Sequence, residues 1–140
     1  YVEVKTDESI LPDLLDEIEK SGLDEGQVFV VSFSREVIRA LKGAAPHYGA
    51  AWLCGVKEDE HGGRTPPLET VLGTLQATGA DGFSSSAGCI DESFVRQVMD
   101  AGYEYHVWTV DHPEAARRFR DLGVTSITTN VPGGIRDALG

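Results

Sequence analysis

The chain has 140 residues, 41% of them hydrophobic, which is the length of a single domain with enough apolar side chains for a core. Its net charge of -11 argues against a nucleic-acid backbone or an anionic membrane surface as the main partner. No apolar run approaches the length that a membrane span needs, and the first residues show no signal-peptide pattern.

The first predicted element is a strand over residues 2–5. Because strand side chains alternate between two faces, Tyr1, Glu3 and Lys5 would share one face, opposite Val2 and Val4. An acid and a base two positions apart on an inner face are costly to bury unless they bind something. The chain begins within this pattern, so we expect it to start inside an active site. A Glu3–Lys5 ion pair without a ligand is the simpler alternative.

Helical patterns and short apolar runs then alternate along the chain. Apolar side chains at helical spacing predict four amphipathic helices, with stripes over residues 10–18, 68–75, 94–99 and 115–122. We expect helices to end at glycine, which adopts a left-handed backbone without steric cost. The candidate glycines are Gly22, Gly43, Gly79, Gly102 and Gly123. Short apolar runs predict five more strands, at residues 28–32, 50–53, 80–83, 106–110 and 126–129.

Local signals refine this outline. The polar, glycine-rich residues 55–67 predict one longer loop. Asp111 and Glu114 predict a capping pair for a helix that opens at Pro113. Asn130 predicts either an ordinary cap for the last helix or part of a phosphate site at its free N–H groups.

Buried strands that alternate with helices indicate a parallel sheet, which leaves two architectures open. One is an open doubly wound sheet, which would normally carry a glycine-rich nucleotide loop after its first strand. This chain has Thr6-Asp7-Glu8 there. The other is a (β/α) barrel, which typically needs about 250 residues, so 140 residues would leave it short by about two strands.

Five short motifs, in chain order, resemble those of the glycerophosphodiester phosphodiesterase family. They are Val2-Glu3-Val4-Lys5, Val31-Ser32-Phe33-Ser34, Ala80-Asp81-Gly82-Phe83, Val107-Trp108-Thr109-Val110 and the closing segment from Leu122-Gly123-Val124 to Asn130-Val131-Pro132. The Trp-Thr-Val strand is the most specific of them. Three places depart from the family pattern: Asp111 stands where Asn is usual, Asn130 stands where Asp is usual, and Ser84-Ser85-Ser86-Ala87-Gly88 replaces a more apolar turn that contains Asn.

The resemblance implies an α/β fold, a partial (β/α) TIM barrel whose six βα units correspond to the last six of eight. Residues 1–140 would form a single partial barrel without the first two units. In the family, those units carry a His-Arg motif, a Glu-x-Asp motif and a further His. They supply the acid/base histidines and two metal carboxylates, so no catalytic acid or base can be assigned in this chain.

The resemblance also implies an activity. The complete protein would hydrolyse glycerophosphodiesters to sn-glycerol 3-phosphate and an alcohol with Mg²⁺ or Ca²⁺, and the isolated chain would be inactive. Glu3 carries over as a metal ligand, and Lys5, Phe33 and Trp108 carry over as substrate-binding residues. The small-molecule glycerophosphodiester would be the partner.

Some of these residues also have a purely structural interpretation. Trp108 is equally consistent with a core aromatic, and His106, on the same strand face, is predicted as a hydrogen-bonded interior histidine. An unrelated phosphate-binding barrel is a further possibility. The chain is also consistent with a non-catalytic binding or self-association module, a homo-oligomer formed through open sheet edges and through uncovered inner-face side chains such as Val30 and Leu53.

Overall fold

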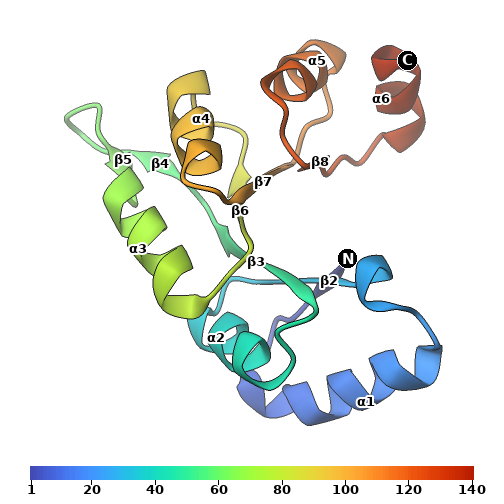
Figure 1. The fold of residues 1–140 in the computed structure, drawn as a ribbon. Helices are drawn as coiled ribbons and strands as arrows, with labels where there is room; N and C mark the ends of the chain where they lie inside the picture. Colours follow the sequence, from blue (N-terminus) through green and yellow to red (C-terminus); the bar gives the residue numbers. More distant parts are fainter.

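The computed structural model describes all 140 residues as a curled, six-stranded parallel sheet with helices along its outer side (Figure 1). The spatial order of the strands is β1-β2-β3-β6-β7-β8. Their bounds are β1 Val2–Glu3, β2 Phe29–Ser32, β3 Gly49–Cys54, β6 Gly82–Ser86, β7 Glu104–Trp108 and β8 Ser126–Ile127. The helices are α1 Leu11–Ser21, α2 Arg35–Ala44, α3 Leu68–Thr78, α4 Glu92–Asp100, α5 Pro113–Leu122 and α6 Pro132–Leu139.

This arrangement confirms the predicted partial barrel. An open doubly wound sheet would have helices on both faces, whereas here the helices surround a C-shaped sheet from one side (Figure 1). Strand β1 pairs only with β2, and β8 pairs only with β7, so the sheet does not close on itself. None of the helices combines the length and the apolar character that crossing a bilayer requires.

The main core lies between the sheet and its helices and contains 27 buried residues. The inner face of the sheet holds only a small cluster of three, namely Val31, Ala51 and Leu53. The prediction that Val30 lies on the inner face is wrong, because Val31 is the residue in register with Glu3 and Val30 is fully buried on the helix side. Burial against the helices therefore stabilises the sheet, while its inner face is left for a cavity.

Glycine ends three helices as predicted. Gly22, Gly79 and Gly123 each follow the last helical residue with a left-handed backbone, at φ values of 72°, 72° and 85°. Gly43 does not, because α2 continues to Ala44, and the residue that caps its end is Ala45. At the start of the first predicted stripe, Ile10 belongs to a short 3-10 turn and is exposed.

Several predicted bounds shift. Strands β6 and β7 each begin two residues away from the predicted start, at Gly82 and Glu104, and β1 ends before Lys5. The polar segment 55–67 is not a plain loop, because Lys57–Glu58 and Arg64–Thr65 pair as a short antiparallel hairpin. Such two-residue strands are too short to leave an alternating hydrophobic pattern in the sequence.

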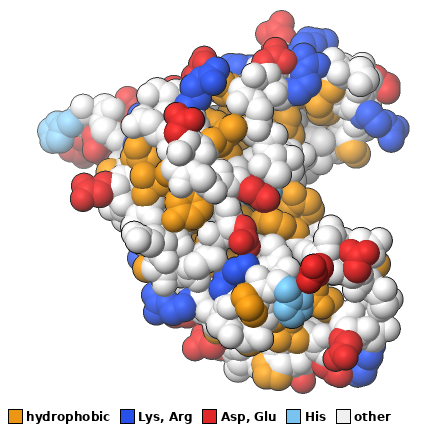
Figure 2. Space-filling model, in the orientation of Figure 1, with side chains coloured by type: hydrophobic (Ala, Val, Ile, Leu, Met, Phe, Trp, Pro, Cys, Tyr) orange, Lys and Arg blue, Asp and Glu red, His pale blue; other side chains and the backbone are white.

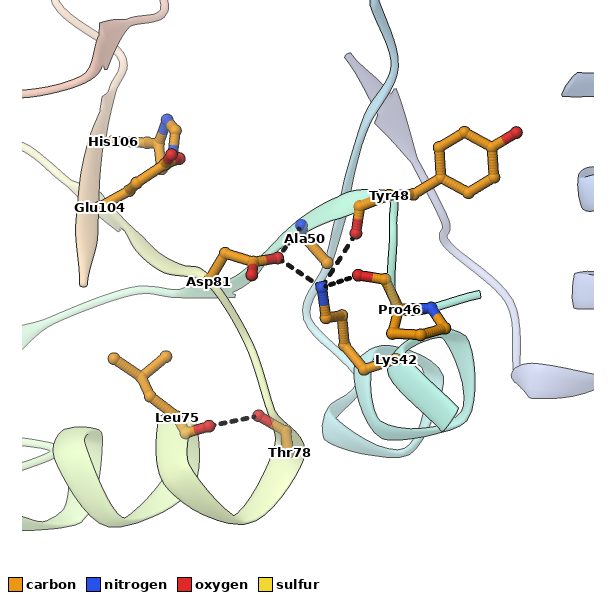
Figure 3. A network of polar contacts seen from close by, with 9 residues as sticks. All are labelled: Lys42, Pro46, Tyr48, Ala50, Leu75, Thr78, Asp81, Glu104 and His106. Carbon is orange, nitrogen blue, oxygen red and sulfur yellow. Dashed lines mark hydrogen bonds and ion pairs between the residues drawn. The ribbon is translucent and has the colours of Figure 1, made fainter. Parts of the chain in front are cut away.

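An ion pair fixes the amino end of the sheet, at the point where β6 begins (Figure 3). The ammonium of Lys42, on α2, lies 2.8 Å from Asp81 Oδ2 and also donates to the carbonyl oxygens of Pro46 and Tyr48, at 2.8 and 3.1 Å. The same Asp81 oxygen accepts from the backbone N–H of Ala50 at 2.8 Å. Asp81, the acid of the Asp-Gly motif, thus joins α2, β3 and β6 at the amino ends of the strands.

Candidate functional site

A cavity of about 420 Å³ opens on the inner face of the curled sheet and extends to the carboxyl ends of its strands. The space-filling view shows the molecule hollowed on its concave side, with hydrophobic side chains beside the hollow (Figure 2). The cavity is lined by Tyr1, Glu3, Val31, Phe33, Leu53, Ser84, His106, Trp108, Thr109, Ser126 and Thr128. Three of the four predicted site residues therefore face one cavity, and Lys5 lies in an adjoining hollow that shares Glu3 and Phe33 with it.

Glu3 and Lys5 form an ion pair, with Lys5 Nζ 3.6 Å from Glu3 Oε2, as in the simpler of the two interpretations of the sequence. Their side chains are 36% and 76% exposed. An exposed pair at this distance contributes little to stability, typically about 0–1 kcal/mol. The pair can therefore open at low cost to present an ammonium and a carboxylate to a ligand in the cavity.

Phe33 and Trp108 form an aromatic wall. Their ring centroids lie 5.9 Å apart at an edge-on angle of 75°, and Phe33 is 55% exposed. Trp108 packs against the inner cluster with its other side, so it belongs to the inner core and to the cavity wall at once. Its Nε1–H is buried and has no hydrogen-bond partner. A buried donor without a partner typically costs about 1–3 kcal/mol, and a bound acceptor would remove that cost.

His106 is a buried, hydrogen-bonded interior residue, as predicted. Its Nε2 lies 3.1 Å from Glu104 Oε2, and its Nδ1 lies 2.8 Å from Ser126 Oγ and 3.4 Å from the Tyr1 hydroxyl. Because a carboxylate only accepts, Nε2 carries the proton and Nδ1 accepts from Ser126. Burial lowers the pKa of His106, against an opposing effect of Glu104. Both ring nitrogens are occupied, so His106 shapes the cavity floor.

The loops after β7 and β8 meet at Asp111. Its carboxylate accepts from the Thr129 hydroxyl at 2.9 Å, from the Asn130 backbone N–H at 2.8 Å and from Asn130 Nδ2 at 3.0 Å. The backbone N–H of Asn130 is the main cause that lowers the pKa of Asp111. Two of the positions that depart from the resembled pattern, Asp111 and Asn130, are thus hydrogen-bonded to each other.

This pairing corrects two capping predictions. Asp111 does not cap α5, because His112 precedes the helix and makes no side-chain cap. Asn130 does not cap α6 either, because Val131 holds that position without a side-chain cap. Asp111 turns toward three donors on the next strand's loop instead of toward the start of its own helix. A partner from a distant part of the chain is invisible to a local capping rule.

The sequence prediction missed several cavity residues. Ser84, Ser126 and Thr128 line the cavity, yet none of them is predicted as a site residue, although Ser126 and Thr128 lie within the closing segment. Ser84 lies beside His106 in the parallel register, so strand parity would have found it if the strand bounds had been right. Tyr1 is predicted on the same face as Glu3, and it does line the same cavity.

The donor set of this chain does not fit a complete divalent-metal site. Glu3 is the one carboxylate that lines the cavity, and nowhere in the chain do three His, Cys, Asp or Glu side chains come together as metal ligands. Mg²⁺ and Ca²⁺ take about six to eight oxygen ligands. One carboxylate from these residues supplies only part of such a shell.

Comparison with known proteins points to one family. The model of the glycerophosphoryl diester phosphodiesterase family matches residues 1–134. A putative glycerophosphoryl diester phosphodiesterase from Silicibacter pomeroyi is 20% identical, with a TM-score of 0.81 over 98% of this chain and 48% of that chain. A putative glycerophosphodiester phosphodiesterase from Galdieria sulphuraria is 22% identical, with a TM-score of 0.78 over 98% and 55%.

A phosphodiesterase from Oleispira antarctica, solved in complex with the product sn-glycerol-3-phosphate, is 16% identical, with a TM-score of 0.76 over 98% of this chain and 53% of that chain. At these identities the solved structures establish the shared fold. This chain spans about half the length of the structures it matches. No curated protein sequence matches it.

Proposed function

We propose, given that the chain belongs to the glycerophosphoryl diester phosphodiesterase family, that it is the C-terminal part of a barrel enzyme. That enzyme hydrolyses glycerophosphodiesters to sn-glycerol 3-phosphate and an alcohol. The observation that carries the proposal is the convergence of the Glu3–Lys5 ion pair and the Phe33–Trp108 aromatic pair on one hollowed face. Barrel enzymes perform their chemistry at the carboxyl ends of the strands, where these residues lie.

The substrate-binding roles follow from the chemistry of these side chains. The exposed ammonium of Lys5 pairs with a nonbridging phosphate oxygen, because cations stabilise the negative charge that gathers on phosphate oxygens during the reaction. Phe33 and Trp108 pack against the glycerol carbons. A cavity of about 420 Å³ has the size of a small-molecule site. The product found in the Oleispira antarctica structure supports glycerol phosphate as the ligand class.

Metal dependence is a separate part of the proposal. We place Glu3 as one carboxylate ligand of a Mg²⁺ or Ca²⁺ ion in the complete protein. The remaining ligands would come from outside these 140 residues, since the chain itself has no second cavity carboxylate. Bound there, the ion would supply positive charge beside the phosphate.

The isolated chain should be inactive. Its one cavity histidine, His106, is buried with both ring nitrogens engaged, and general acid–base help is worth about 10²–10⁴-fold in rate. The test measures glycerol 3-phosphate released from a glycerophosphodiester by the purified chain with Mg²⁺ or Ca²⁺. Release above that of a Glu3→Gln control would contradict this part of the proposal.

The unpaired edges favour a second candidate function, a binding or self-association module. β1 and β8 each leave one side without a strand partner, and such edges readily pair with another chain. The exposed Phe33 adds apolar surface on the inner face of the sheet. We expect light scattering to detect a dimer or larger assembly of the isolated chain. A compact monomer across micromolar concentrations argues against this function.

A further inference from the structure

A second hollow lies on the helix side of the sheet, between α2 and α3. Its volume is about 250 Å³, and it is lined by two arginines of α2 and by small or hydroxyl-bearing side chains of α3. The arginines are Arg35 and Arg39, one helical turn apart on the same face. None of the residues that line it also lines the cavity on the inner face.

The two arginines lack acidic partners. No carboxylate lies within ion-pair distance of either one, whereas Arg64, Arg96 and Arg120 all form ion pairs. The neighbouring acid, Glu36, instead accepts a hydrogen bond from the Ser34 hydroxyl at 3.2 Å. Arg117, Arg118 and Arg136 also lack ion pairs, so what distinguishes Arg35 and Arg39 is that both line one hollow.

Arg35 is also held in place. Its guanidinium carbon lies 5.8 Å from the centroid of the Trp52 ring, and Trp52 is itself fixed by a hydrogen bond from Nε1 to the carbonyl oxygen of Phe33 at 3.1 Å. A guanidinium over an aromatic face loses less freedom when it binds a ligand, because the stacking already limits its position. Its N–H edge remains available.

Thr74 supplies a third donor to the hollow. Its side chain is nearly buried, since 7% of the residue is exposed, and it lines the same hollow. A helical threonine usually donates its hydroxyl to a carbonyl one turn earlier, as Thr78 does to Thr74 at 2.8 Å. The Thr74 hydroxyl makes no hydrogen bond within the chain. Trp108 Nε1 is the one buried side-chain polar atom of the chain without a partner, so the Thr74 hydroxyl is accessible, and it faces the same hollow as the two guanidinium groups.

We propose that the hollow between α2 and α3 binds a phosphate-type anion, with Arg35, Arg39 and Thr74 as donors. Guanidinium groups bind phosphate oxygens through paired N–H donors. A phosphate offers at least three acceptor oxygens and so matches three donors that line one hollow, whereas a carboxylate offers only two. The ligand is a phosphomonoester or inorganic phosphate, either soluble or carried as a lipid head group. This inference does not depend on the hydrolytic activity.

The test is a calorimetric titration of the chain with inorganic phosphate at constant ionic strength. We expect saturable binding that weakens about tenfold in Arg39→Gln and in Thr74→Val, which is a loss of about 1.4 kcal/mol each. Thr74→Ser keeps the hydroxyl and should bind like the unchanged chain. The matched control is Arg96→Gln, whose arginine is paired with Glu92. This control should leave binding unchanged.

Two results overturn the proposal. One is phosphate binding that Arg39→Gln and Thr74→Val leave unchanged, and the other is binding that only Lys5→Gln weakens, which places the anion at the inner face. A second arm uses phosphatidylcholine vesicles with and without phosphatidic acid. Capture that requires phosphatidic acid and is lost in Arg39→Gln supports a lipid head group as the source. Phosphate binding without vesicle capture supports a soluble phosphate compound.

Discussion

Trp108 offers the sharpest separation between a substrate contact and a core residue. It packs on the inner cluster of Val31, Ala51 and Leu53, and its buried Nε1–H has no partner in the ligand-free chain. The informative change is Trp108→Phe in the complete protein, because it keeps most of the aromatic packing and removes only the N–H and part of the ring. Trp108→Ala serves as the comparison that also removes the packing.

The structure sets the expected magnitudes. Removing a buried donor that has no partner abolishes a cost of about 1–3 kcal/mol, which offsets the packing lost with the smaller ring. The stability of Trp108→Phe should therefore stay within about 1 kcal/mol of the unchanged protein. Full truncation of a buried Trp typically costs about 3–5 kcal/mol, and Trp108 is only half-buried, so Trp108→Ala should lose roughly 2 kcal/mol.

The activity should rank the variants differently. If the Nε1–H donates to the bound substrate, Trp108→Phe should lower kcat/KM about tenfold, the equivalent of about 1.4 kcal/mol, although the protein is as stable as before. The assay compares urea unfolding with glycerol 3-phosphate release in the same variant. Unchanged kcat/KM in Trp108→Phe, together with a loss of stability in Trp108→Ala alone, would refute the substrate role and leave Trp108 as a core residue.

Three further predictions concern Glu3, Asp111 and Lys42. Glu3→Gln in the complete protein should weaken Mg²⁺ or Ca²⁺ binding. The melting temperature should stay nearly unchanged, because the ion pair of Glu3 with Lys5 is exposed. Unaltered metal affinity by calorimetry would contradict the role of Glu3 as a metal ligand. The lowered pKa of Asp111 means that its contribution to stability is present above the ordinary aspartate pKa and is lost as the pH falls through the lowered folded value. The melting temperature of Asp111→Asn should accordingly depend less on pH below about pH 4. The double variant Asp111→Asn with Asn130→Asp should regain that dependence. Identical pH profiles for the unchanged protein, the single variant and the double variant would contradict this role of Asp111. Lys42→Met should lower the free energy of unfolding in urea by about 1.5–3 kcal/mol, because it removes the three hydrogen bonds of a nearly buried ammonium and leaves Asp81 without its cation. A loss below about 0.5 kcal/mol, which is usual for surface changes, would contradict that role of Lys42.

Much of the fold could be predicted because it depends on patterns that are local in the sequence. Alternating apolar runs and helical stripes predict the six strands and four of the six helices, and short motifs favour a barrel over an open sheet. The inner positions of Glu3, Phe33 and Trp108 follow from the same reasoning, since residues at strand ends converge in a barrel.

What the sequence could not predict is the choice of partner among distant polar groups. Asp111 had a plausible local role as a cap, but three donors from the following strand's loop compete for it and prevail. Lys42 and Asp81 are 39 positions apart, and no periodicity links them. Such contacts differ in free energy from their local alternatives by only about 1 kcal/mol, so the three-dimensional arrangement decides between them.

The most direct test of the proposed function is the release of sn-glycerol 3-phosphate from a glycerophosphodiester by the complete protein, with and without the substitution Lys5→Gln. The Lys5 side chain is exposed, so its loss should leave the fold intact. We predict metal-dependent release by the unchanged protein and a fall in kcat/KM of at least about tenfold in Lys5→Gln. Equal rates for the two proteins, or no release by either, would contradict the assignment of this face as the phosphodiester site.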